Sequence, residues 1–266
     1  MELEFKVRYG PWALILGGSE GLGAEFARQL AQKGLHLILL ARDKDQLEIT
    51  AEDIRKKEAV SVITWEYDLA QPGLVPFIEK NLEGQEIAML IYNAAYPLIG
   101  DFLEARPEQH RALIQINIQA PQEVTYHFAQ QMKAKGRGGI ILLSSLAGFY
   151  GTAKVSHYAA SKAYNLILAE GLWEEMRKEG IDVLALCPGR TRTPGYESSQ
   201  PKKIGSLQPP LMETSPVVKE ALKVLGKKPS IISGPYNRWA SAFMRLFLPR
   251  KKAVELISKN TREMYD

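Results

Sequence analysis

Short apolar runs alternate along the chain with longer segments in which apolar and polar residues recur at helical spacing. The apolar runs predict strands at Trp12–Leu16, Leu35–Leu40, Val60–Trp65, Ile87–Ile91, Gly139–Leu143, Asp182–Leu186 and Ile231–Ser233. The longer segments predict helices at Gly21–Lys33, Lys44–Lys57, Gly73–Leu82, Pro107–Lys135, His157–Glu179 and Pro216–Leu225. Strands that are apolar throughout are typical of sheets covered on both faces, and alternation with helices is typical of right-handed parallel crossovers. The pattern therefore predicts an α/β fold: a doubly wound parallel sheet of about seven strands with helices on both faces.

Two segments fall outside this alternation. Residues 190–215 are rich in proline and polar side chains and follow a predicted strand at the carboxyl edge, where open α/β sheets bind ligands. We expect a substrate lid there; a disordered surface insertion is the alternative. Residues 235–266 predict a helical extension that could cap an apolar pocket, lie on a membrane surface or pack on the core. No low-complexity linker interrupts the chain, so residues 1–266 are expected to form one domain.

Composition and charge narrow the class of protein. Of the 266 residues, 45% are hydrophobic and 24% charged, the balance of a globular enzyme. The net charge of +4 is small and the basic residues are scattered, which argues against a nucleic-acid partner. Cys187 is the sole cysteine, and no Cys/His cluster has metal-ligand spacing, so we expect no disulfide within the chain and no metal. Without a bilayer-length apolar run or a secretory signal, a cytoplasmic protein fits best.

A glycine-rich turn comes directly after the first predicted strand. Gly17, Gly21 and Gly23 stand where that strand ends and the first helix begins. Glycines there permit a tight turn and a close approach of backbone to phosphate, and the free amides and dipole of the helix start favour an anion. The spacing is wider than the common dinucleotide pattern, and a plain strand-to-helix turn is the alternative. The context nevertheless predicts a dinucleotide site.

The end of the second predicted strand indicates which dinucleotide binds. An acidic residue there would hold the two ribose hydroxyls of NAD, but the strand ends in Ala41, and Arg42 offers a guanidinium suited to the 2′-phosphate of NADP. Glu20 in the glycine turn and Asp43 beside the arginine would oppose a phosphate. NADP(H) is therefore preferred, with NAD(H) as the alternative.

Tyr158 and Lys162 form the strongest chemical motif. Four residues apart on a predicted helix, they share one face. A phenol has an ordinary pKa near ~10, and an ammonium group beside it favours the phenolate, which lowers that pKa toward working pH. Ser145 ends the fifth predicted strand, thirteen residues earlier, and its hydroxyl can meet Tyr158 across the strand–helix junction. An exposed Tyr/Lys pair on a helix surface is the alternative.

These motifs together resemble the short-chain dehydrogenase/reductase family over about residues 10–195. The resemblance is carried by the glycine turn, Asn93-Ala-Ala, Asn117, Ser145, Tyr158-x-x-x-Lys162 and Pro188-Gly189, in that order. It implies a Rossmann-type fold and hydride transfer between a nicotinamide and a small-molecule carbonyl or alcohol. Residues 9–13, Tyr-Gly-Pro-Trp-Ala, resemble the branch that contains hydroxysteroid dehydrogenases and long-chain 3-oxoacyl-CoA reductases, which points to an apolar, steroid-like or acyl-chain substrate.

The resemblance also implies individual roles. Ser145 would polarise the carbonyl, Tyr158 would exchange the proton, and Lys162 would hold the nicotinamide ribose and lower the pKa of Tyr158. Asn117 would hold a water that links Lys162 to solvent. The cofactor would be bound by Gly17, Ser19, Gly21, Leu22, Gly23, Arg42, Asp68, Leu69, Asn93, Tyr158, Lys162, Thr191 and Thr193.

Departures from the family pattern and alternative functions remain. Leu16 replaces the usual threonine, and Tyr92-Asn-Ala-Ala95 replaces the usual Asn-Asn-Ala-Gly. A non-catalytic NADP-binding regulator on the same scaffold is the main alternative, and an epimerase or dehydratase is a third. The family implies a homodimer or homotetramer built on the helices at Pro107–Lys135 and His157–Glu179. Peripheral membrane contact through the C-terminal segment is a further option.

Overall fold

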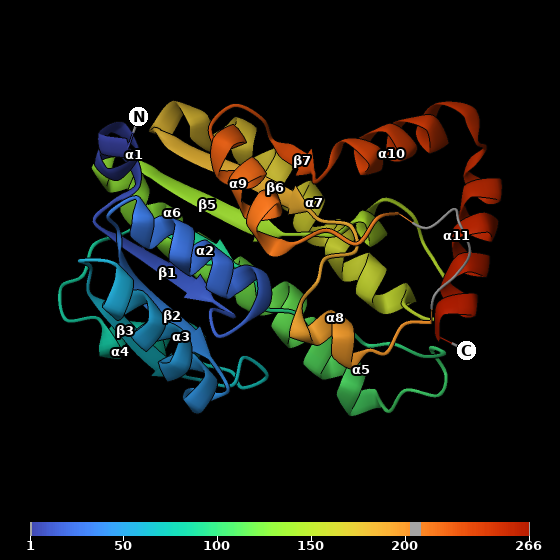
Figure 1. Cartoon of the computed structure of the whole chain (residues 1–266), viewed down its shortest axis with the longest axis horizontal. Coiled ribbons are helices and arrows are strands. Elements are labelled where there is room, and N and C mark those ends of the chain that lie inside the picture. The colour runs from blue at the N-terminus through green and yellow to red at the C-terminus, as the bar shows by residue number, and fades with distance from the viewer. Residues whose placement is uncertain (1, 203–208, 266) are drawn as a thin grey trace.

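A seven-stranded parallel sheet forms the centre of the molecule, in the order β3-β2-β1-β4-β5-β6-β7 (Figure 1). The computed structural model describes residues 2–202 and 209–265. The strands are β1 (Trp12–Leu16), β2 (His36–Ala41), β3 (Val62–Glu66), β4 (Ile87–Tyr92), β5 (Gly138–Leu143), β6 (Ile181–Cys187) and β7 (Ser230–Ile232). The predicted fold class is confirmed, and each predicted strand is found within two residues of its predicted bounds. The strand order reverses between β1 and β4, the point at which such sheets bind ligands.

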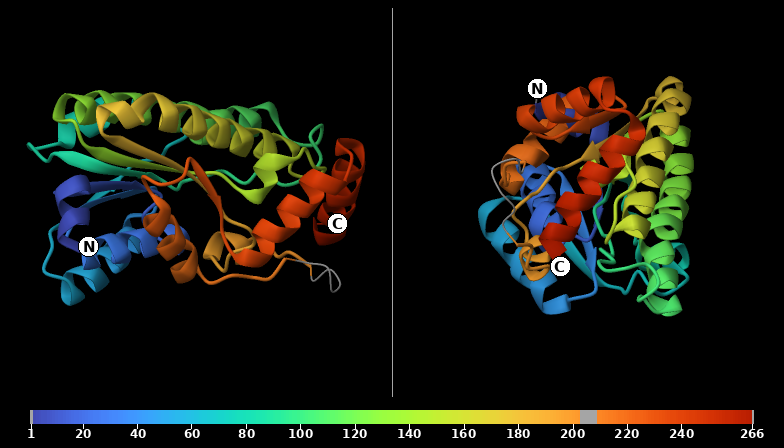
Figure 2. Two further views of the ribbon diagram at one scale, coloured as in Figure 1. Left: turned by 90° about the horizontal axis from the view of Figure 1, so that it is seen from above. Right: turned by 90° about the vertical axis from the view of Figure 1, so that its right-hand side faces the viewer.

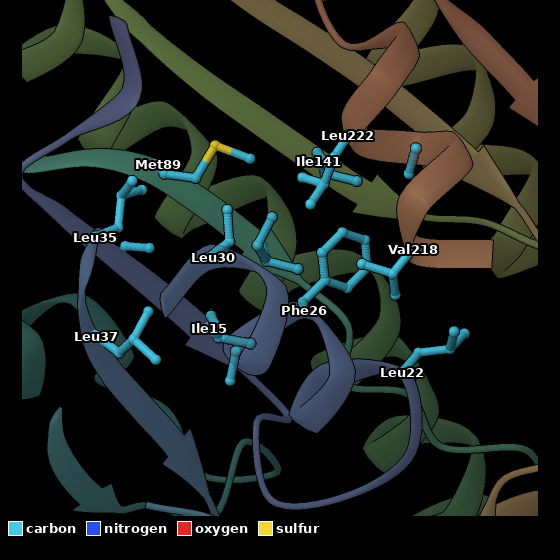
Figure 3. Packing of buried hydrophobic residues seen from close by; sticks show 14 of the residues in the cluster. Ile15, Leu22, Phe26, Leu30, Leu35, Leu37, Met89, Ile141, Val218 and Leu222 are labelled. Atoms are coloured by element: carbon cyan, nitrogen blue, oxygen red, sulfur yellow. The ribbon is translucent and has the colours of Figure 1, made fainter. Parts of the chain in front are cut away.

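Helices cover both faces of the sheet, as the alternating pattern predicted. One face carries α2 (Gly21–Gln32), α3 (Lys44–Lys57) and α9 (Thr214–Val224); the other carries α4 (Leu74–Asn81), α6 (Ala120–Lys135) and α7 (Ser156–Met176). Figure 2 shows the sheet between these two layers. On the first face, Phe26 and Leu30 of α2 pack against strand residues such as Ile15 and Met89 (Figure 3). This packing fixes the start of α2 at the end of β1.

Two helical regions differ from their predicted form. The chain begins with a helix that the pattern did not predict, α1 (Glu2–Tyr9). It is held by contacts distant in sequence, because Tyr9 Oη donates to Asp182 Oδ2 at 2.6 Å and Arg8 Nε lies 2.5 Å from the same oxygen. The single helix predicted at Pro107–Lys135 is instead α5 (Pro107–Ile114), a π-helical turn (Gln115–Gln119) and α6. Hydrophobic periodicity cannot reveal a single π turn within a continuous helix.

The predicted lid is partly described. Its two ends lie side by side, since Arg192 N donates to Met212 O and Met212 N to Arg190 O, at 2.8 and 2.9 Å. Between them stands a short helix, α8 (Pro194–Ser198). Residues 203–208 of the predicted lid lie outside the described residues.

The predicted C-terminal extension consists of two helices, α10 (Pro235–Phe247) and α11 (Arg250–Tyr265). Figures 1 and 2 show α11 lying across the end of the molecule, beyond the carboxyl edge of the sheet. On α10 the buried side chains are small and polar, and the large apolar ones are exposed: Tyr236, Trp239, Phe243, Leu246 and Phe247. Across residues 2–202 and 209–265, no helix combines the length and apolarity needed to cross a membrane.

Candidate active site

The glycine turn lies at the point where the strand order reverses. Asn93 follows β4 as Gly17 follows β1, and Asn93 Nδ2 donates to Gly17 O at 2.8 Å. A Cβ on Gly17 would lie 2.8 Å from Ala94 N, and a Cβ on Gly23 would overlap Gly17 O and lie 2.8 Å from Asn93 Nδ2. Gly17 also has a φ of +78°, a value that favours glycine. The turn is therefore close-packed, with no room for side chains.

The start of α2 offers backbone amides to a ligand. Glu20 is its N-cap residue, but its side chain makes no capping hydrogen bond, and the first turn of α2 contains no acidic residue. Thr193 of the predicted lid lies over this turn, because a Cβ on Gly21 would come within 3.0 Å of Thr193 Cγ2. The uncapped amides, the missing Cβ atoms and the helix dipole fit a pyrophosphate.

The other predicted nucleotide contacts lie along the same edge. Arg42 is exposed directly after β2, and Asp43 beside it caps α3 by accepting from Gln46 N at 3.0 Å. The Asp43 carboxylate therefore faces the amides of α3 and opposes a phosphate at Arg42 less than its sequence position suggested. Asp68 follows β3 and accepts from Ala70 N at 3.0 Å.

Three further residues of the predicted nucleotide site have buried side chains. Leu22 and Leu69 belong to the hydrophobic core, one on each face of the sheet. The Ser19 side chain is buried, and Ser19 O accepts from Thr50 Oγ1 at 2.7 Å. The side chains of these three residues therefore pack in the interior beneath the predicted nucleotide site.

Ser145 and Tyr158 meet across the junction of β5 and α7. Ser145 Oγ accepts from Ala147 N at 3.2 Å, which caps a short 3₁₀ turn, and its hydroxyl lies near the Tyr158 phenol. Burial raises the pKa of Tyr158 to about 12, and the nearby Ser145 hydroxyl opposes that shift. The direction is opposite to the one expected from the lysine alone. At neutral pH the phenol keeps its proton.

Lys162 is buried one turn further along α7. Its Nζ lies 5.6 Å from the centroid of the Tyr158 ring and donates to Leu143 O at the end of β5 at 2.8 Å. The surface pairing considered as the alternative is wrong, since Lys162 is 2% exposed. Burial lowers the pKa of Lys162 to about 8. Ser144 Oγ donates to Lys162 O at 2.7 Å, which attaches β5 to α7 at this level.

Asn117 lies in the π turn and is fully buried. Its Oδ1 accepts from Tyr96 N at 2.7 Å, and its Nδ2 donates to Tyr96 O and to Ser161 Oγ at 3.1 and 3.0 Å. Ser161 Oγ in turn donates to Tyr158 O at 2.7 Å. Single π turns inside α-helices are frequent at functional sites. Here the turn places one amide between the strand-end segment at Tyr96 and the helix that carries Tyr158.

The structure adds neighbours that sequence reasoning missed. Tyr265, at the end of α11, lies close enough to Tyr158 to contribute to its raised pKa. His110 Nδ1 and His157 Nδ1 are 2.8 Å apart, and His157 directly precedes Tyr158 in the chain. His110 Nε2 also faces Phe102 O at 3.1 Å. The contacts of Tyr265 with Tyr158 and of His110 with His157 join residues at least 47 positions apart, beyond the reach of local patterns.

Comparisons with known proteins agree with this geometry. A family model described as short chain dehydrogenase matches residues 11–204. A 7beta-hydroxysteroid dehydrogenase from Clostridium sardiniense is 27% identical over 239 residues, which cover 89% of this chain and 90% of that protein. A very-long-chain 3-oxoacyl-CoA reductase from Mus musculus is 30% identical over 223 residues, covering 82% of this chain and 70% of that protein.

Solved structures give the same picture. A structure from work on 7beta-hydroxysteroid dehydrogenase stereoselectivity superposes with a TM-score of 0.88 at 26% identity, covering 95% of this chain and 98% of that one. A short-chain dehydrogenase from Sphingobium yanoikuyae, in complex with NADPH, superposes with a TM-score of 0.75 at 30% identity, covering 92% and 96%.

Proposed function

The chain belongs to the short-chain dehydrogenase family and is an oxidoreductase that acts on CH–OH/C=O groups, and from this premise we propose that it uses NADP(H) to interconvert an apolar ketone and its secondary alcohol. The observation that carries the proposal is the meeting of a serine, a tyrosine and a buried lysine at the carboxyl edge of β5. The Ser145 hydroxyl lies close enough to the Tyr158 phenol to affect its pKa, and Lys162 Nζ lies 5.6 Å from the centroid of the Tyr158 ring.

In the reduction direction, the carbonyl oxygen binds between Ser145 and Tyr158. A bound NADP(H) would supply the hydride. The Ser145 hydroxyl stabilises the charge that develops on the oxygen, and Tyr158 transfers its phenolic proton to it. Because its pKa is raised to about 12, Tyr158 is protonated at neutral pH, as this direction requires. In the oxidation direction the same proton returns to the phenolate.

Lys162 and Asn117 support that proton transfer. With a pKa of about 8, Lys162 is mostly an ammonium at neutral pH and can both hold a ribose hydroxyl and stabilise the phenolate after transfer. Asn117 donates to Ser161, whose hydroxyl donates to the backbone carbonyl of Tyr158. Asn117 therefore stabilises the turn of α7 that carries the tyrosine. We assign to Asn117, in the π turn, the water that would link Lys162 to solvent.

The residues directly after β2 favour NADP(H) over NAD(H). Arg42 is exposed there, and Asp43 is engaged at the start of α3. A guanidinium binds phosphate through paired, charge-assisted hydrogen bonds. Gly17, Gly21 and Gly23 would hold the pyrophosphate at their turn, with Thr193 of the predicted lid beside it.

An apolar substrate is supported by the relatives and by the tail. The chain resembles proteins named for steroid and very-long-chain acyl substrates, and α11 lies across the end of the molecule beyond the carboxyl edge of the sheet.

The test is cofactor consumption by the purified chain with a ketosteroid, a 3-oxoacyl thioester and a simple bulky ketone. We expect NADPH to be oxidised faster than NADH, and Arg42→Ala to raise the KM for NADPH by about 10- to 100-fold, the value of one charge-assisted phosphate contact. The KM for NADH should change little. Preference for NADH, or an unchanged KM for NADPH, contradicts the assignment. Cofactor binding without consumption by any of the ketones favours the regulatory alternative.

We assign the subunit interface of a homodimer or homotetramer to the outer face of α7. That face forms an apolar groove lined by small residues such as Ala160, Ala163 and Gly171, with Ile167 exposed beside them. Small residues let two helices approach closely. Light scattering should give a multiple of the chain mass of 29.8 kDa for the natural protein and the chain mass for Ile167→Glu. A chain cut before Pro235 shows whether the tail takes part.

A further inference from the structure

The apolar face of α10 points away from the protein. In Figure 1, α10 leads from β7, an edge strand of the sheet, to α11 at the end of the molecule. Its buried residues, Asn237 and Ser241, lie one turn apart and face the protein. An amphipathic helix normally buries its apolar side, and here that side is exposed. The exposed apolar residues recur at intervals of three and four, which places them along one side of the helix: Tyr236, Trp239, Phe243, Leu246 and Phe247.

The aromatic rings of this face contact one another in a row. The ring centroids of Tyr236 and Trp239 are 6.5 Å apart, those of Trp239 and Phe243 5.7 Å, and those of Phe243 and Phe247 5.1 Å. Trp239 is 64% exposed and Phe247 69%. The rings therefore form a continuous apolar strip on the surface. Such strips, when polar residues border them, are typical of contacts with a protein or a membrane.

The excess of positive charge lies in the same part of the chain. Of the 34 basic and 30 acidic residues, residues 235–266 contain seven basic and three acidic ones, so the net charge of +4 lies entirely in this segment. Residues 235–252 contain no acidic residue at all. The basic residues that follow the start of α10's last turn are exposed: Arg245, Arg250, Lys251 and Lys252.

Nearby carboxylates balance only part of this charge. Glu255 lies 3.1 Å from Lys252 and 4.0 Å from Lys251, so one carboxylate is shared by two exposed ammonium groups. At the start of α10, Arg238 lies 3.1 Å from Glu220. Exposed pairs of this kind contribute little and exchange readily for other anions. The end of the apolar strip is therefore bordered by a cationic surface.

An anionic lipid surface fits both features. Tryptophan and phenylalanine rings favour the boundary between headgroups and acyl chains, and lysine and arginine are attracted to anionic headgroups. A second copy of the chain fits less well. A two-fold contact places the same patch on both subunits, and it would bring the basic residues of two copies together with no acidic residue in 235–252 to pair with them.

We propose that α10 docks on an anionic lipid surface through its apolar face, with the basic residues at 250–252 against the lipid headgroups. Docking does not depend on the proposed reaction. It does complement that reaction, because apolar ketones concentrate in lipid and the docked enzyme meets them there.

Sedimentation of the full chain with lipid vesicles measures docking. We expect vesicles of phosphatidylcholine and phosphatidylglycerol to bind the chain about 10-fold or more tightly than vesicles of phosphatidylcholine alone at about 50 mM NaCl, and this difference to shrink at about 0.5 M. All four tryptophans are described, and only Trp239 is exposed. Its fluorescence should therefore shift to shorter wavelength when the chain binds.

Two pairs of substitutions test the two features separately. Trp239→Ser together with Phe243→Ser should weaken binding to the anionic vesicles by about 100-fold, because two aromatic side chains no longer enter the lipid. Lys251→Gln together with Lys252→Gln should weaken it by about 10-fold at about 50 mM NaCl and have little effect at about 0.5 M. Each variant should unfold at the natural temperature, since the altered side chains are exposed.

Matched variants on α3 are the controls, because α3 joins β2 to β3 at the opposite edge of the sheet from β7. Ile49→Ser removes an apolar side chain that is 62% exposed, close to the value for Trp239. Lys56→Gln together with Lys57→Gln removes two neighbouring exposed lysines, each paired with an acid four residues earlier. Both controls should bind the anionic vesicles within about 3-fold of the natural chain.

Three results would overturn the proposal. The first is no binding to anionic vesicles, and the second is equal weakening by the α3 variants. The third is a mass in light scattering that rises with protein concentration in the natural chain but not in Trp239→Ser with Phe243→Ser, without vesicle binding, which would assign the apolar face to a second copy. None of these results affects the reductase function, which is measured by NADPH oxidation without vesicles.

Discussion

Replacing Lys162 with methionine should raise the stability of the fold at neutral pH while abolishing activity. Lys162 is 2% exposed, and burial lowers its pKa from the ordinary 10.5 to about 8. The folded pKa lies below the unfolded one, so the unfolded chain binds more protons between these values and stability rises as pH rises through this window. At about pH 7 the buried ammonium costs roughly 3 kcal/mol, and at about pH 9.5 roughly half of that.

Methionine removes this penalty together with one hydrogen bond. The lost bond runs from Lys162 Nζ to Leu143 O at 2.8 Å. An unsatisfied buried carbonyl costs about 1–3 kcal/mol, so the net gain at about pH 7 is about 0–2 kcal/mol. The part of this stability difference that changes with pH does not depend on that hydrogen bond. The advantage of Lys162→Met over the natural chain should therefore shrink by about 2 kcal/mol between about pH 7 and about pH 9.5, or roughly 4–8 °C in Tm.

Thermal unfolding followed by circular dichroism at several pH values measures this difference. Burial also raises the pKa of Tyr158 and of Cys187, each to about 12, but both groups are present in both proteins and their contributions cancel. Lys178→Met, at an exposed position, is the control and should show a Tm difference that does not vary with pH. If the Tm difference for Lys162→Met is equally constant, the buried-ammonium argument is wrong.

Three further outcomes follow from the contacts. Gly23→Ala would place a Cβ 2.8 Å from Asn93 Nδ2 and into Gly17 O, and we expect NADPH affinity, measured by calorimetry, to fall by about 100-fold because the turn must move by about 1 Å; unchanged affinity would show that the turn does not hold the cofactor. Tyr9→Phe removes the 2.6 Å bond to Asp182 and should lower the free energy of unfolding in urea by about 1–3 kcal/mol without changing NADPH affinity; an unchanged urea midpoint would show that α1 is held in another way. Trp239→Ser should change the free energy of unfolding by no more than about 0.5 kcal/mol, since this side chain is 64% exposed. A larger drop in Tm that depends on protein concentration would show that another copy of the chain covers the apolar face of α10, and a loss of binding to lipid vesicles would show that a lipid surface does.

The fold was predictable because its core strands are short, apolar and regularly spaced. Leu14 to Leu16 and Ile140 to Leu142 are buried on both faces of the sheet, so no polar residue interrupts the pattern. The α1 helix was not predictable, because its stability comes from a bond between Tyr9 and Asp182, 173 positions apart. Its sequence has no strong periodicity of its own.

In the candidate site, too, residues that are close in sequence were predictable, and features that depend on the whole fold were not. Tyr158 and Lys162 were predictable because four residues of helix bring them together, and Ser145 because a strand end precedes that helix. The raised pKa of Tyr158 was not, because it depends on burial by the whole cleft. Tyr265 lies over a hundred positions from Tyr158, and only the path of α11 brings the two together.

The most direct measurement is the rate of NADPH oxidation by Tyr158→Phe with a ketone that the natural chain reduces, measured together with NADPH affinity. Loss of the phenolic proton should lower kcat by about 10²- to 10⁴-fold, the contribution of a general acid. NADPH affinity should stay within a few-fold, because the pyrophosphate and ribose contacts are preserved. Full activity in Tyr158→Phe would contradict the assignment of Tyr158 as the proton donor.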